Sequence, residues 1–265
     1  MDTITLWELV ALAGAATLVG FSKTAVSGAN TVSLAIFAAV LPARESTGIL
    51  LPLLIVGDVF AVRAYRRHAD WATLVRLFPA VSAGVVAGTV FMLWADDAAV
   101  RTSIGVILLV MASVTVWRRR TAGRQARGRK GQGEEEERGE PAGEGRQRAR
   151  LKAGSYGVLG GFTTMVANAG GPVMSMYLLS AGFRKLGFLG TSAWFFLIVN
   201  VAKVPFSVGL GLIDGHSLLL DAGLALCVIP GAFLGRAVVG RINQRLFERL
   251  VIAATVVGGL QLLLR

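Results

Sequence analysis

The sequence predicts an all-α polytopic membrane protein built from two inverted-topology repeats, each with a broken or re-entrant helix. Hydrophobic residues make up 54% of its 265 residues and charged residues only 16%, whereas a soluble domain carries roughly 25% charged residues. The apolar residues gather in runs close to the ~20 residues that a transmembrane helix needs. A polar, glycine-rich interruption occurs at a similar position in each half of the chain.

The first repeat, residues 1–117, opens on an apolar run of about spanning length at 4–21. The polar stretch 22–30 interrupts it, and the apolar run 32–41 that follows is too short to cross alone, because a full span needs ~20 residues. We therefore expect a helix, a break and a half-helix that doubles back. The other spanning helices expected in this repeat lie at 46–65, 74–94 and 100–117.

Residues 118–150 have a different composition. They hold 11 of the 27 basic and six of the 16 acidic residues, with almost no large apolar side chains. Such a segment cannot bury enough apolar surface to offset the entropy of folding. We therefore expect a charged, disordered linker that joins the two repeats on the cytoplasmic side.

The second repeat, residues 151–265, follows the same plan as the first. Its expected helices lie at 153–167, 172–182, 187–212, 217–239 and 248–264. The dipeptide Gly-Phe opens both interruptions, at 20–21 and 161–162. The matching positions further along are Pro79 with Pro230 and Gly84 with Gly235. Interrupted apolar segments at corresponding positions of two halves indicate the binding site of a transporter.

The basic loops predict the orientation, because lysine and arginine in loops are retained on the cytoplasmic side. These loops include 66–67, the linker 118–150, 184–185 and 241–249. These loops all lie on one side of the membrane only if each unit of helix, break and half-helix enters and leaves the membrane on the same side. The two halves then have opposite orientations, and both termini lie on the periplasmic side.

The two interruptions predict an anion-binding site if they meet near the middle of the bilayer. Each presents the N-terminus of a half-helix, where free N–H groups and the helix dipole favour negative charge. Glycines let a ligand approach the backbone, and Asn, Ser and Thr supply neutral donors. The candidate substrate-binding residues are Ser22, Lys23, Thr24, Ser27, Asn30, Thr31, Thr163, Thr164, Asn168, Gly170, Gly171, Asn200 and Lys203. The alternative is that the small residues only allow close helix packing.

Three ionisable residues lie within apolar segments. Such residues cost roughly 2.5 to 3.5 kcal/mol on insertion scales, so they usually face a cavity or a partner. Lys23 or Lys203 could pair with an anionic substrate, although Lys23 could instead extend toward an interface. Asp58 is a candidate carrier of a coupling proton, or else a structural partner of Lys203, Lys23 or Arg63.

Several classes of function are excluded by the sequence. It has no phosphate-binding loop, no HExxH or CxxC motif, and no serine with a supporting His and Asp set. An intramembrane protease needs two aspartates inside helices, and only Asp58 meets that condition. The net charge of +11 is spread over the linker and short loops, without the basic face that binds nucleic acid. We expect no enzyme, no cofactor, no metal and no nucleic-acid partner.

The motif Asn-Ala-Gly-Gly-Pro at 168–172, after the Gly-Phe at 161–162, has a weaker Ser-Gly-Ala-Asn counterpart at 27–30. Together with the charged central loop, this pattern resembles the TauE/SafE family of sulfite exporters, over nearly the whole chain except 118–150. The resemblance implies an inverted-repeat transporter of the bacterial inner membrane that moves sulfite or small organosulfur anions such as sulfoacetate, generally outward. The first interruption departs from the family's glycine-rich run and holds Lys23 instead.

These observations together predict a secondary transporter that exports a small anion, sulfite or an organosulfonate, by alternating access. Its partners are the anion and the lipid bilayer, and a homo-oligomer is left open. One alternative is an importer of another small anion, such as thiosulfate or a carboxylate. The other is a membrane enzyme or scaffold that binds without transport.

Overall fold

The computed structural model describes residues 5–25, 30–128, 142–238, 252–253, 256–257 and 259–264. Nearly all of them are helical, and no strand occurs among them. The helices are α1 (Leu6–Thr24), α2 (Asn30–Val40), α3 (Ala43–Tyr65), α4 (Trp71–Trp94), α5 (Asp97–Gly128), α6 (Ala142–Ala167), α7 (Gly170–Ser180), α8 (Lys185–Gly209) and α9 (Gly215–Val238), with a 3₁₀ turn at Arg66–His68. The expected helix at 248–264 falls partly outside the described residues.

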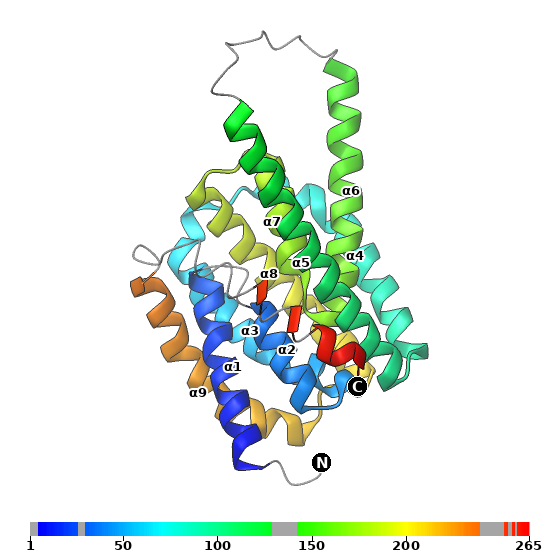
Figure 1. Cartoon of the computed structure of the whole chain (residues 1–265), viewed down its shortest axis with the longest axis vertical. Helices are drawn as coiled ribbons and strands as arrows, with labels where there is room; N and C mark the ends of the chain where they lie inside the picture. Colours follow the sequence, from blue (N-terminus) through cyan, green and yellow to red (C-terminus); the bar gives the residue numbers. More distant parts are fainter. Residues whose placement is uncertain are drawn as a thin grey trace.

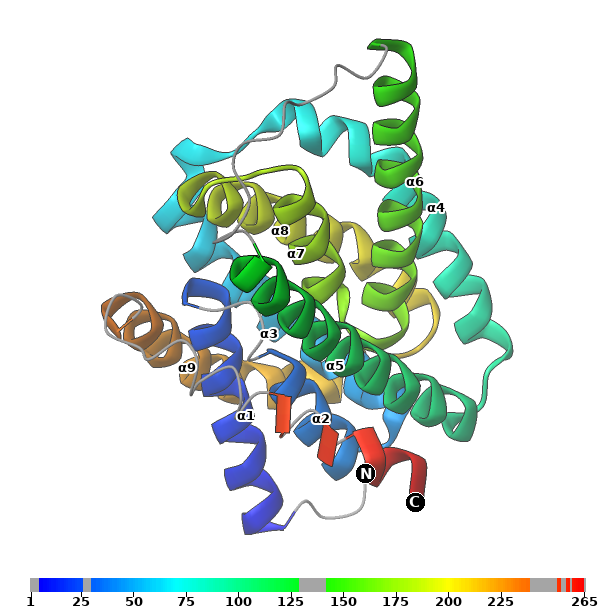
Figure 2. The ribbon, with the colours of Figure 1, turned by 45° about the horizontal axis from the view of Figure 1, so that its top comes forward.

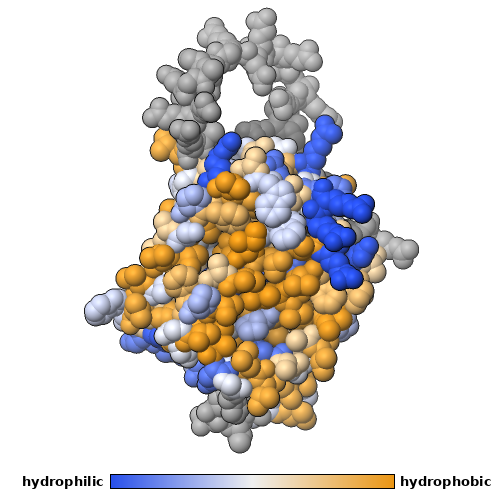
Figure 3. Space-filling model, turned by 180° about the vertical axis from the view of Figure 1, so that it is seen from behind, coloured by the Kyte–Doolittle hydropathy of each residue, from blue (hydrophilic) through white to orange (hydrophobic). Residues whose placement is uncertain are grey.

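Within the described residues, six helices are long and apolar enough to cross a membrane: α1, α3, α4, α5, α8 and α9. The helices α2 and α7 have 11 residues each, too few for a bilayer that needs ~20. Apolar side chains cover the middle of the face in Figure 3, and hydrophilic side chains gather toward the upper end of the view. The prediction of an all-helical, multi-pass membrane protein is therefore confirmed.

The helices of the two halves pack against one another. Figures 1 and 2 show α1 beside α9 on one flank and α4 beside α6 on the other. The helices α3 and α8 pack together between these pairs. The start of α1 lies at one end of the molecule, and the ends of α5 and α6 that flank 129–141 lie at the opposite end (Figure 1).

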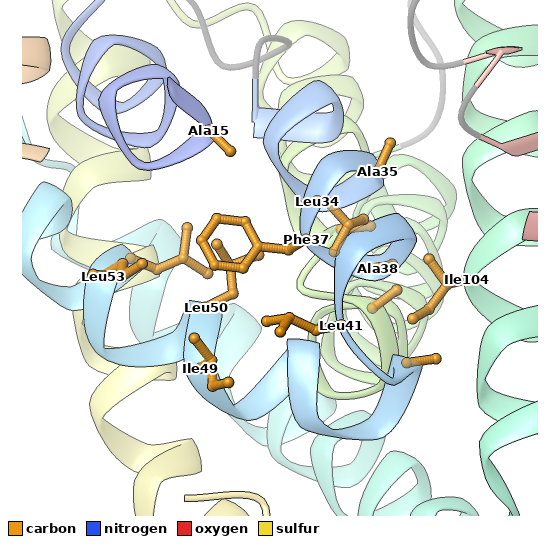
Figure 4. Close-up of a cluster of buried hydrophobic side chains, with 14 of the residues drawn as sticks. Ala15, Leu34, Ala35, Phe37, Ala38, Leu41, Ile49, Leu50, Leu53 and Ile104 are labelled. Atoms are coloured by element: carbon orange, nitrogen blue, oxygen red, sulfur yellow. The ribbon is translucent and has the colours of Figure 1, made fainter. Parts of the chain in front are cut away.

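The short helix α2 is held by a buried apolar cluster. Phe37 is fully buried and lies between α1 and α3 (Figure 4), close to Ala15, Leu50 and Leu53. A buried aromatic ring contributes a large share of such a contact because of its area. This cluster fixes the half-helix beside the spanning helices and so fixes the position of its N-terminus.

The predicted linker is shorter in the structure than in the sequence analysis. Residues 118–128 continue α5, and residues 142–150 begin α6. Arg, Gln, Ala and Glu have high helix propensity, so such a segment can be helical without burying an apolar face. The expectation of disorder considered burial alone. Residues 129–141 lie outside the described residues.

Glycines allow the close crossings between the halves. A Cβ atom added to Gly20 of α1 would lie 2.0 Å from the carbonyl oxygen of Val228 in α9. A Cβ atom added to Gly161 of α6 would lie 2.2 Å from the carbonyl oxygen of Val81 in α4. Small residues at such crossings let helix backbones approach closely within a membrane. The packing interpretation therefore applies to these two glycines.

We expect Gly20→Ala to lower the melting temperature, because overpacking at a tight contact costs about 1 to 3 kcal/mol. The matched control is Gly14→Ala on the same helix, where an added Cβ meets nothing within 4 Å. Thermal unfolding in one detergent compares the two variants with the parent chain. Equal melting temperatures for Gly20→Ala and Gly14→Ala would contradict the packing at this crossing.

Candidate functional site

Asn168 and Ala169 separate α6 from α7. Asn168 has a φ angle of 49°, in the left-handed region that asparagine tolerates better than most residues. Its N–H donates to the carbonyl oxygen of Thr164 at 3.1 Å, and the N–H of Ala169 donates to that of Thr163 at 3.2 Å. These bonds close the last turn of α6. The predicted site residues Thr163 and Thr164 therefore lie in the helix and not in the break.

The first interruption is shorter than the sequence predicts. Helix α1 ends at Thr24 and α2 begins at Asn30. Residues 26–29, which include the predicted site residue Ser27, lie outside the described residues. Three residues expected in the break belong instead to the end of α1: Ser22, Lys23 and Thr24.

Polar contacts explain why α1 continues to Thr24. The Thr24 hydroxyl lies within hydrogen-bond distance of three carbonyl oxygens, those of Gly20 at 3.2 Å and Phe21 at 3.4 Å in its own helix and that of Ala232 in α9 at 2.8 Å. The N–H of Asn30 at the start of α2 donates to the Ser22 hydroxyl oxygen at 3.0 Å. The last turn of α1 is thus tied both to α9 and to the half-helix that follows.

The two interruptions meet. The Asn30 side-chain Nδ2 donates to the backbone carbonyl oxygen of Asn168 at 3.4 Å. The Asn168 side-chain Nδ2 donates to the carbonyl oxygen of Thr47 in α3 at 2.9 Å. Residues from both halves of the chain therefore come together at one place between the spanning helices.

Lys203 of α8 lies beside this junction with only 1% of its surface exposed. Its ammonium group donates to Asn168 Oδ1 at 2.6 Å and to the carbonyl oxygen of Thr164 at 2.5 Å. It forms no ion pair within the part of the chain that the structure describes. Lys203 therefore orients the Asn168 amide.

Lys23 of α1 pairs with Asp58 of α3. The Nζ and Oδ1 atoms are 2.6 Å apart, and the Asp58 side chain is 0% exposed. The other carboxylate oxygen accepts a hydrogen bond from Asn200 Nδ2 of α8 at 2.7 Å. The Lys23 ammonium also lies 4.6 Å from the centre of the Phe196 ring, within the range of a cation–π contact. Of the partners considered for Asp58, the structure selects Lys23.

A cavity of about 40 Å³ lies at this junction. One water occupies roughly 10 to 15 Å³ on this measure, so the cavity has the scale of a small oxyanion. The predicted site residues that line it are Ser22, Lys23, Asn30, Thr164, Asn168, Gly171 and Asn200, together with the coupling candidate Asp58. The other lining residues are Leu54, Ala61, Leu189, Ser192, Ala193 and Phe196.

Some predicted site residues do not line the cavity. They are Thr24, Thr31, Thr163, Gly170 and Lys203. The hydroxyl of Thr163 donates to the carbonyl oxygen of Leu159 at 2.8 Å within its own helix. Gly170 packs on Thr164, whose Cβ atom would lie 3.0 Å from an added Cβ. The sequence pattern predicts which segments contribute to the site, but it does not predict which face of each helix turns toward the cavity.

Asp221 is a second aspartate inside a spanning helix, so the statement that only Asp58 has this place is wrong. It lies in α9, it is 3% exposed, and neither carboxylate oxygen has a hydrogen-bond partner among the described residues. The sequence feature that could have identified Asp221 is an acidic residue inside the apolar run 217–239. Asp221 does not line the cavity, whereas Asp58 does and pairs with Lys23.

The described residues contain no cluster of three or more His, Cys, Asp or Glu side chains that could hold a metal ion.

The sequence model of the family described as sulfite exporter TauE/SafE matches residues 12–262, nearly the whole chain. The chain belongs to this family. TauE/SafE proteins are membrane transporters of anions, so membership of this family favours an anion transporter over an enzyme. The matched range includes both interruptions and every cavity-lining residue. No curated protein and no solved structure matches the chain.

Proposed function

We propose that this TauE/SafE protein is a secondary transporter that exports a small oxyanion, sulfite or an organosulfonate, from the cytoplasm. The observation that carries the proposal is the meeting of two interrupted helices, one from each half, at a cavity that the Lys23 ammonium lines. In a membrane, irregular backbone is tolerated where it lines a cavity. Charged residues inside spans usually mark a substrate pathway.

We infer that the two halves are inverted repeats. An added Cβ at Gly84 of α4 would lie 2.9 Å from the backbone nitrogen of Phe162, and one at Gly235 of α9 would lie 2.7 Å from the carbonyl oxygen of Phe21. The phenylalanine of each Gly-Phe motif thus meets the matching glycine of the other half. This reciprocal packing is what a pseudo-two-fold axis between the halves requires.

The anion would bind at the ends of α2 and α7. Lys23 supplies charge, Ser22 and Asn30 supply polar contacts, and Gly171 lets the ligand approach the N-terminus of α7. Charge-assisted hydrogen bonds are about twice as strong as neutral ones, so Lys23 contributes most of the binding. Lys203 acts as a positioning residue, since it contacts Asn168 but does not line the cavity.

Alternating access would come from one half rocking against the other about the Asn30–Asn168 contact. The chain would lie in a bacterial inner membrane, with 66–67, 184–185 and the linker in the cytoplasm and both termini in the periplasm. Asp58 is the candidate for the coupling proton. Its ion pair with Lys23 supports this role, because the proton and the anion would then act on the same pair of side chains.

Flux in proteoliposomes tests the function. Vesicles that contain the protein should release labelled sulfite faster than empty vesicles, and unlabelled methanesulfonate should compete. Faster uptake of thiosulfate or a carboxylate than of sulfite would favour the importer. Saturable binding without any flux would favour the enzyme or scaffold.

We expect transport to survive replacement of residues 129–141 by a Gly-Ser segment of equal length. The proposed site lies within the packed helices, so this part of the linker only connects the halves. The measurement is sulfite flux normalised to the amount of protein inserted. A loss of flux with normal insertion would instead support a scaffold that docks partners through the linker.

A further inference from the structure

The face of α8 that lines the cavity changes from polar to apolar along its length. Asn200, close to the junction, binds Asp58 of α3. Earlier on the same helix, the cavity is lined by Phe196, Ala193 and Leu189, whose spacing of three and four residues places them on one face. An α-helix rises about 1.5 Å per residue, so this lining extends roughly 16 Å from Asn200 to Leu189. The cavity therefore continues beyond the polar groups that would hold the anion.

Helix α3 supplies the opposite wall. Ala61, which follows Asp58 by one turn, lies in the same buried apolar cluster as Ala193. Residue numbers rise along α3 as they fall along α8, so the two helices pack antiparallel here. Both alanines are buried and both line the cavity. Because alanine carries only a methyl group, these two residues leave space between the helices.

This end of the cavity has little to offer a charged or hydrogen-bonding ligand. Among the described lining residues here, Ser192 has the one polar side chain, and its hydroxyl donates to the carbonyl oxygen of Phe188 within α8. The remaining lining residues here form an apolar wall, which consists of Ala61, Leu189, Ala193 and Phe196. Such a wall favours apolar groups, because removing apolar surface from water is favourable by about 25 cal/mol per Å².

Lys23 lies where the polar part of the cavity meets the apolar wall. Its ammonium group pairs with Asp58 and lies 4.6 Å from the centre of the Phe196 ring. Both Lys23 and Phe196 line the cavity. An oxyanion bound at Lys23 would therefore lie next to the Phe196 ring, where the apolar wall begins.

We propose that the apolar wall is a subsite for the carbon chain of a short organosulfonate whose sulfonate group binds at Lys23. This assignment, which rests on the proposed function, adds the residues that recognise the part of the substrate other than its sulfur oxyanion. Sulfite would occupy the polar part alone, whereas an organosulfonate would occupy both parts. The cavity of about 40 Å³ holds about three or four waters, which fill roughly 90 to 120 Å³ of liquid. This space limits the chain to a few carbons.

A series of sulfonates of increasing chain length tests the subsite: methanesulfonate, ethanesulfonate and propanesulfonate. Each carries one negative charge near neutral pH, so the charge state of the site affects all three alike. Their dissociation constants are measured by thermal-shift titration of the purified full chain in detergent, at constant ionic strength. We expect affinity to rise about fourfold with each added carbon, because one buried methylene group contributes about 0.8 kcal/mol.

Ala193→Val should remove this rise, because it fills the space between α3 and α8. Propanesulfonate should bind about tenfold more weakly than to the parent chain, whereas methanesulfonate should stay within about twofold. The retained binding of methanesulfonate also shows that the variant is folded. The matched control is Ala202→Val, the same change at an exposed position of α8 that does not line the cavity. It should keep the whole series unchanged.

Leu189→Ala tests the subsite without overpacking, since it makes a side chain smaller. It removes apolar contact at the end of the wall farthest from Lys23. Propanesulfonate should therefore lose several-fold in affinity and methanesulfonate should lose none. This variant decides the matter if Ala193→Val binds no ligand at all.

Equal affinities across the series in the parent chain, or affinities that fall with chain length, would overturn the inference. A rise with chain length that persists in Leu189→Ala and in a folded Ala193→Val would also overturn it, because the chain would then bind elsewhere. Sulfite flux in proteoliposomes would continue in either case. Failure of the proposed function has a different signature: the parent chain would bind none of the sulfonates and would not release labelled sulfite.

Discussion

Sulfite transport should be lost when Lys23 is replaced by methionine. Lys23 is the cationic side chain that lines the cavity, and hydrogen bonds to a charged group contribute about 1.5 to 3 kcal/mol. This loss corresponds to roughly 10- to 150-fold weaker anion binding. Methionine keeps most of the length and apolar volume of lysine, so the Phe196 contact and the end of α1 remain filled. Flux in proteoliposomes and thermal-shift titration measure the two effects.

The same substitution leaves Asp58 without its ion-pair partner, and a single change would therefore confuse stability with binding. Removing one partner of a buried pair costs about 3 to 5 kcal/mol. The double variant Lys23→Met/Asp58→Asn removes both charges and keeps the Asn200 contact. We expect it to recover most of the thermal stability but none of the transport. Recovery of transport in the double variant would mean that Lys23 only neutralises Asp58.

The positions of the spanning helices could be predicted from the sequence, because the length and the apolar composition of a segment determine whether it can cross a membrane. The runs at 46–65 and 74–94 correspond to α3 and α4 within a few residues. The end of α1 could not be predicted, because Thr24 bonds to Ala232, which lies 208 residues away in the chain. A local pattern of Gly, Ser and Asn signals an interruption but does not contain that partner.

The place of the site could be predicted, but not the roles of its charged residues. Both lysines were candidates for the anion, and the structure places Lys23 at the cavity and Lys203 behind Asn168. The distinction depends on which face of α1 and α8 turns inward. Periodicity cannot resolve that for helices that are apolar on nearly every side. Asp221 lies far from both interruptions in the sequence, so the pattern that predicts the site does not include it.

Asn168→Leu should abolish transport and lower stability together. Asn168 makes three contacts at the junction: one to Lys203 in its own half, and two to the other half, with Thr47 and, through its carbonyl oxygen, with Asn30. Leucine removes the two side-chain contacts, and a buried polar group that loses its partner costs about 1 to 3 kcal/mol. Leucine is also unfavourable at a φ of 49°. Insertion into the membrane should remain normal, because the apolar helices are unchanged.

Two further variants at this position separate the backbone from the side chain. Asn168→Gly accepts the left-handed conformation but lacks the amide, whereas Asn168→Asp keeps an acceptor for Lys203 and loses the donor to Thr47. If the side chain positions Lys203, Asn168→Asp should retain more flux than Asn168→Gly, and Asn168→Leu should retain none. Equal flux in the glycine and aspartate variants would show that the turn alone matters. Normal flux in Asn168→Leu would remove this junction from the transport pathway, because the two interrupted helices would then meet without any consequence for the anion.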